Sequence, residues 1–70
     1  MEDQREEAAA QPPAKLADFM GYQRWDEPDG TRRMTLFQAG RMVELRPDEE
    51  TAKQPPGFYD LGHNPVPAPV

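Results

Sequence analysis

Two turn sequences within residues 21–46 constrain the fold more than any other feature of this chain. The first is Glu27-Pro28-Asp29-Gly30, where proline suits the second turn position and glycine can take the positive φ that closes a hairpin. The second is Ala39-Gly40, a two-residue hairpin loop. Three short strands are therefore predicted, joined as an antiparallel meander over about residues 21–46.

The two turns also predict a single strand register, because each fixes which residues of the adjoining strands lie opposite one another. Around the first turn the predicted pairs are Asp26 with Arg32, Trp25 with Arg33, Arg24 with Met34, Gln23 with Thr35 and Tyr22 with Leu36. Around the second turn they are Phe37 with Met42, Leu36 with Val43 and Met34 with Leu45.

Side chains alternate between the two faces of a strand, so this register divides the sheet into two chemically different faces. The first face carries Tyr22, Met34, Leu36, Val43 and Leu45, with the stem of Arg24 among them. The second carries Gln23, Trp25, Arg33, Thr35, Phe37, Met42, Glu44 and Arg46. The aliphatic first face is predicted to be the core.

A three-stranded sheet with one apolar face needs a cover, which the flanking segments are expected to supply. The candidates are Leu16, Phe19 and Met20 on one side and Phe58, Tyr59 and Leu61 on the other. One or two helical turns are expected between Pro47 and Gln54, where acids follow a proline. The predicted class is thus a small α+β or mainly β fold with disordered termini.

Composition divides the chain into three parts. Residues 1–14 are predicted to be a disordered acidic tail, because they hold too little apolar surface to offset the entropy of ordering. Residues 15–61 are predicted to form the folded domain. Residues 62–70, with proline at every second position from Pro65, are predicted to be an extended tail.

Residue usage argues against an enzyme, a cofactor site and a metal site. The chain has no cysteine, no serine and a single histidine, His63, so it offers neither a nucleophile with a partner base nor a zinc ligand set. Asp60 lies three residues before His63, but Gly62 and Pro65 place the pair in a loop. A surface histidine is the better interpretation.

The same features give an expected location. No apolar run approaches the roughly 18 residues that a membrane span needs, and the N-terminus is acidic where a signal peptide would be basic. A cytoplasmic protein is expected. Its brevity and its alanine, proline and arginine usage suggest a bacterial or bacteriophage origin, and a phage protein would act in the host cytoplasm.

The predicted binding site lies on the face opposite the aliphatic one. It comprises Trp25, Arg33, Phe37, Met42 and Arg46, because tryptophan and arginine are the residue types that most often anchor interfaces. The alternative is that a C-terminal segment covers this face. If the patch is free, it would dock on a larger protein.

The function expected from these residues is that of a small protein-binding regulator, an adaptor or inhibitor that is a monomer when isolated. A minor structural subunit of a virion or multiprotein assembly is the first alternative. A single-stranded nucleic-acid binder is the second, since aromatics and arginines share one face. A net charge of −5 opposes nucleic acid.

Overall fold

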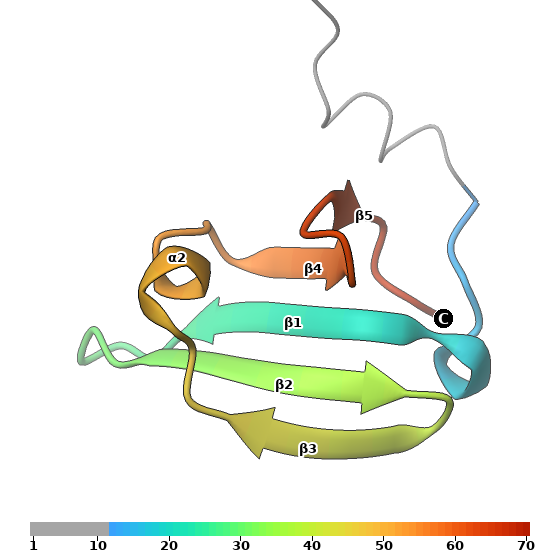
Figure 1. Cartoon of the computed structure of the whole chain (residues 1–70), viewed down its shortest axis with the longest axis horizontal. Helices are drawn as coiled ribbons and strands as arrows, with labels where there is room; N and C mark the ends of the chain where they lie inside the picture. The colour runs from blue at the N-terminus through green and yellow to red at the C-terminus, as the bar shows by residue number, and fades with distance from the viewer. Residues whose placement is uncertain (1–11) are drawn as a thin grey trace, which may run out of the picture.

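The structure is a computed structural model that describes residues 12–70. A five-stranded antiparallel sheet dominates it, with strand order β3-β2-β1-β4-β5 (Figure 1). The strands are β1 (Met20–Asp26), β2 (Arg32–Gln38), β3 (Arg41–Leu45), β4 (Gly57–Asp60) and β5 (Pro65–Val66). A 3-10 turn, η1 (Leu16–Asp18), precedes the sheet, and one short helix, α2 (Glu49–Ala52), lies between β3 and β4.

The predicted meander and its register are confirmed. All eight predicted pairs occur, from Asp26 opposite Arg32 to Met34 opposite Leu45. In the first turn Gly30 takes a φ of 91°, and its N–H donates to the Glu27 carbonyl. In the second turn both Ala39 and Gly40 have positive φ, as a two-residue hairpin with right-handed strand twist requires.

Two segments that were expected outside the sheet belong to it. Phe58 and Tyr59 lie in β4, which pairs with β1, so they extend the sheet instead of covering it. Residues 62–70, predicted as an extended proline-rich tail outside the folded domain, join it: β5 pairs with β4, and Val70 exchanges backbone hydrogen bonds with Ala14 and Leu16. Of the predicted acidic tail, residues 1–11 lie outside the described part of the chain.

The helix predicted between Pro47 and Gln54 is present as the four residues of α2. Asp48 caps it, because its carboxylate accepts the Thr51 N–H at 2.8 Å. In Figure 1 the chain leaves β3, crosses in front of the sheet as α2, and enters β4 on the far side of β1. This crossing places α2 on the face that carries Tyr22 and Arg24, called the α2 face below.

The core is aromatic and divided between the two faces of the sheet. On the α2 face, Tyr22 and Tyr59 are buried and their rings stack with centroids 5.2 Å apart. On the opposite face, Phe19 and Phe37 are buried with ring centroids 5.6 Å apart, and Phe58 lies within 6.1 Å of both. The prediction of one aliphatic core face is therefore wrong.

Gly21 explains how the phenylalanine cluster fits against the backbone. A Cβ atom at this position would lie 2.2 Å from the Tyr59 carbonyl oxygen and 2.7 Å from the Phe19 ring. Since real Cβ atoms do not approach this closely, only glycine allows β1 to pair with β4 beneath the Phe19 ring.

Candidate functional site

The predicted patch of Trp25, Arg33, Phe37, Met42 and Arg46 is divided by the fold. Phe37 is only 6% exposed, because its ring packs on Phe19 and Phe58. Met42 is 64% exposed, and Arg46 is exposed beyond the end of β3. Trp25 and Arg33 are half-buried and lie together as predicted, with the Arg33 guanidinium 5.7 Å from the Trp25 ring centroid.

Arg33 is held in place by two acids as well as by Trp25. Its guanidinium donates to the carboxylates of Glu27 and Glu44, so it links the first turn to β3. Hydrogen bonds to Glu44 and then Glu27 raise the pKa of Arg33 above its ordinary value. This arginine is therefore a positioned part of the sheet surface, with its charge largely offset by its two partners.

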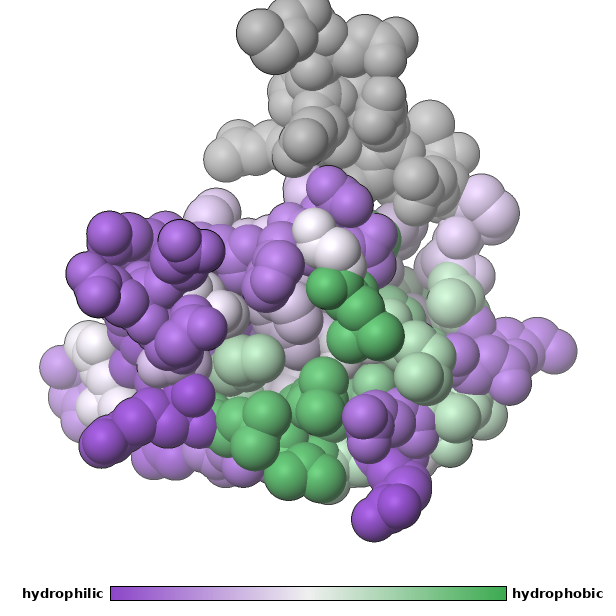
Figure 2. All heavy atoms as spheres, viewed as in Figure 1, coloured by the Kyte–Doolittle hydropathy of each residue, from purple (hydrophilic) through white to green (hydrophobic). Residues whose placement is uncertain are grey.

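The face predicted as the core instead presents an aliphatic surface, defined by Met20, Met34, Leu36, Val43 and Leu45. Met20 is 47% exposed, Val43 44% and Leu45 42%, while Met34 and Leu36 are half-buried. Figure 2 shows hydrophobic side chains gathered over β2 and β3, next to the hydrophilic surface around α2. The physical reason is the size of α2, whose four residues lie against Arg24 but leave β3 bare.

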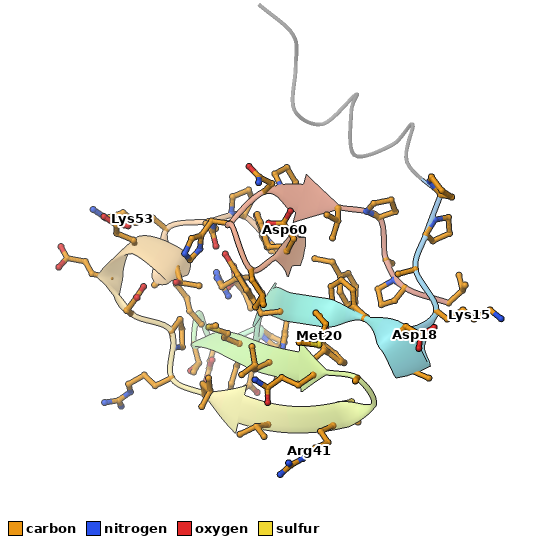
Figure 3. All side chains as sticks on the ribbon, turned by 45° about the vertical axis from the view of Figure 1, so that its right-hand side comes forward. Lys15, Asp18, Met20, Arg41, Lys53 and Asp60 are labelled. Carbon is orange, nitrogen blue, oxygen red and sulfur yellow. The ribbon has the colours of Figure 1, made fainter. Side chains whose placement is uncertain are left out.

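The β2–β3 hairpin is also the basic part of the molecule. Between residues 31 and 46, four arginines stand against the single acid Glu44, which leaves a net charge of +3 in a chain whose total is −5. At the open end of the hairpin lies a pocket lined by Thr31, Arg32, Arg33, Glu44, Leu45 and Arg46. Within residues 12–70, Arg46 forms no ion pair. Figure 3 shows Arg41 projecting beyond β3 at the hairpin's other end.

Arg24 has a role that the alternation of apolar residues did not reveal. Its side chain is 1% exposed, and its guanidinium donates to the carbonyl oxygens of Trp25, Arg33, Thr51, Ala52 and Gln54 and to Asp26 Oδ1. Three of these carbonyls belong to α2 or the residues that end it. Arg24 therefore fastens α2 to the sheet, and the one sequence signal for it was a charged residue among apolar ones.

A small polar cluster lies beside the stacked tyrosines. The Tyr22 hydroxyl donates to Gln54 Oε1 and lies 2.9 Å from His63 Nδ1. Burial raises the pKa of Tyr22 above its ordinary value of 10.0, which favours the protonated phenol. The carboxylate of Asp60 accepts the N–H groups of Gly62 and Asn64, which makes it a brace for the loop. The Tyr22 hydroxyl therefore joins the C-terminal loop, through His63, to the segment that follows α2, through Gln54.

Comparison of the chain with protein-family models, with curated proteins and with solved structures gave no match. Among residues 12–70, no group of three or more acidic or histidine side chains is placed to hold a metal ion. Within the same residues, every helix is too short or too polar to cross a membrane.

Proposed function

We propose that this chain is a small, non-enzymatic protein-binding module that acts by occupying a surface of a larger protein. The observation that carries the proposal is the aliphatic surface. Three of its members, Met20, Val43 and Leu45, are more than 40% exposed, while the aromatic residues that hold the fold are buried. A small domain that leaves its aliphatic side chains out of its own core has them available for contact with a partner.

The composition of this surface favours a protein over a nucleic acid. Single-stranded nucleic acids bind where exposed aromatic rings stack on bases, but here Phe19, Phe37, Tyr22 and Tyr59 are buried. Trp25 is half-buried, and Arg33 and Thr35 contact its ring system. Aliphatic side chains bordered by arginines are typical of protein interfaces instead.

Two substitutions in neighbouring positions of β3 test this proposal. Val43 lies on the aliphatic surface and Met42 on the opposite face, since Val43 pairs with Leu36 and Met42 with Phe37. Both side chains are exposed, so Val43→Glu and Met42→Glu carry the same charge change on the same strand. The parent and both variants would be immobilised, and the proteins captured from a bacterial lysate compared by mass spectrometry.

We expect at least one protein to be captured by the parent and by Met42→Glu, and to be lost with Val43→Glu. Thermal unfolding of each variant serves as the control for folding. A set of captured proteins that is the same for all three would mean that the aliphatic surface does not bind a partner.

A further inference from the structure

The free edge of β3 adds a second feature to the aliphatic surface. β3 is the outermost strand on its side of the sheet, and all five of its residues are exposed. Gln38 and Arg41 flank a two-residue turn, so their backbone groups bond to each other. In an antiparallel pair only every second residue bonds to the neighbouring strand, so Arg41, Val43 and Leu45 are the residues of β3 that bond to β2. The N–H and C=O groups of Met42 and Glu44 therefore point away from β2. Within residues 12–70, no other residue hydrogen-bonds to them.

The opposite edge of the sheet is closed to a further strand. β5 has two residues, Pro65 and Val66, and Pro67 and Pro69 follow it. Proline has no N–H to donate, and short, proline-rich edges are a common protection against unwanted strand pairing. β3 contains no proline and has more than twice the length of β5. One edge of this sheet is protected and the other is open.

Charge indicates what kind of strand fits this open edge. Residues 31–46, which include the β2–β3 hairpin, carry a net charge of +3. Arg41 stands at one end and Arg32 and Arg46 line the pocket at the other, while Arg33 is already paired with Glu27 and Glu44. A second copy of the chain would bring two such hairpins together, and their like charges would repel. An acidic segment is attracted instead.

From these observations we infer that the partner of this module contributes an extended acidic segment that adds to β3 as a sixth strand. This inference rests on the proposed protein-binding function and specifies its geometry. Strand addition satisfies the outward backbone groups of Met42 and Glu44. Alternate side chains of the added strand then lie beside Arg41, Val43 and Leu45 on one face and beside Met42, Glu44 and Arg46 on the other. On that second face Arg33 already pairs with Glu44, and within residues 12–70 Arg46 has no ion pair, so Arg46 is the charge that an added acid would meet. The expected pattern is apolar residues alternating with acids.

A synthetic peptide with this pattern, acetyl-Glu-Val-Glu-Val-Glu-Val-Glu-amide, provides the probe. It would be titrated into ¹⁵N-labelled protein, and the backbone amides followed by NMR. We expect shifts centred on β3, with slower solvent exchange of the Met42 and Glu44 amides. A peptide with lysine in place of glutamate should bind at least about tenfold more weakly, because its charges oppose the hairpin arginines. Equal binding of the two peptides would overturn the inference, as would amide shifts elsewhere than β3.

Met42 offers a matched pair of variants. Met42→Pro removes one outward N–H and leaves the bonds between β2 and β3 intact, whereas Met42→Ala removes the side chain and keeps the N–H. We expect Met42→Pro to bind the peptide at least about fivefold more weakly than Met42→Ala, since a main-chain hydrogen bond is lost. Equal affinities would rule out strand addition.

A modified peptide gives the same test without any change to the protein, should Met42→Pro fail to fold. Only one edge of an added strand pairs with β3, so the N–H groups that bond to β3 belong to every second residue of the peptide. N-methylation of those residues should abolish binding. Methylation of the other set should have little effect. If both methylated peptides bind like the parent peptide, the backbone of the peptide does not pair with β3.

Two further outcomes would also overturn the inference. The first is binding of a dodecamer of thymidylate to β3 in preference to the acidic peptide. The second is a dimer in the sedimentation of the free protein with the Met42 and Glu44 amides already protected, which would mean that a second copy occupies the edge. If the peptide leaves β3 unchanged while Val43→Glu still abolishes capture from the lysate, strand addition is wrong and the proposed docking function stands.

Discussion

At the scale of single residues, one buried arginine fastens the short helix α2 to the sheet. Arg24 is 1% exposed and bonds to carbonyl oxygens on β1, β2 and the α2 region, with one carboxylate, Asp26, as its ion-pair partner. A guanidinium suits this position because its fixed set of donors can serve several acceptors at once. The four residues of α2 bury only Thr51, so Arg24 supplies most of their attachment.

Replacement of this arginine should therefore be costly. Arg24→Met leaves several buried carbonyls without a donor, and we expect the free energy of unfolding to fall by about 3 kcal/mol. Arg32→Met is the control, since Arg32 also donates to the Ala52 carbonyl but is exposed, and it should cost less than about 1 kcal/mol. Urea unfolding followed by circular dichroism measures both. Equal stabilities for the two variants would mean that Arg24 does not fasten α2.

At the scale of elements, the sequence predicted those parts of the fold that depend on residues close together in the chain. The strand pairing of residues 22–45 follows from two turns whose backbone demands are met by Pro28, Gly30 and Gly40, so it was predictable to the residue. β4 and β5 were missed because their pairing depends on contacts far along the chain. Nothing near Phe58 indicates that it will lie beside Gln23, and the prolines around Val66 argued against any strand.

The start of α2 depends on an ionised carboxylate. Hydrogen bonds from the Thr51 side chain and backbone hold the pKa of Asp48 below its ordinary value of 3.8. A lowered pKa in the folded state means that the ionised form favours folding. This contribution is present above the pKa of the unfolded chain, and it is lost as the pH falls through the lower pKa of the folded protein.

Asp48→Asn keeps a side-chain oxygen at the cap but removes the titrating group, so it isolates this effect. We expect the parent to melt at a higher temperature than Asp48→Asn at pH 7, and the difference to shrink as the pH falls below about 4. Thermal unfolding at a series of pH values measures it. A difference that stays constant from pH 7 to pH 2 would contradict the role of the charged cap.

At the scale of the whole molecule, the chain places its aromatic and aliphatic side chains in different roles. Aromatic rings fill both faces of the central strands, and the aliphatic residues of β2 and β3 remain on the surface. The pattern of alternation predicted which residues share a face, but not which face is covered. That choice depends on where α2 crosses the sheet and where β4 joins it, and neither turn chemistry nor hydrophobic periodicity fixes those positions. Phe37 is lost from the predicted patch because Phe19 and Phe58 pack against its ring.

The most direct test of this division is the relative stability of two variants, Phe37→Ala and Val43→Glu, measured by thermal unfolding under one set of conditions. Phe37→Ala removes a ring from the phenylalanine cluster and should cost about 3 kcal/mol or more, most of the stability of a domain this small. Val43→Glu alters a side chain that is 44% exposed on an edge strand and should cost about 1 kcal/mol or less. If Val43→Glu unfolds the protein while Phe37→Ala leaves its melting temperature unchanged, the aliphatic face is the core and its role as a docking surface is wrong.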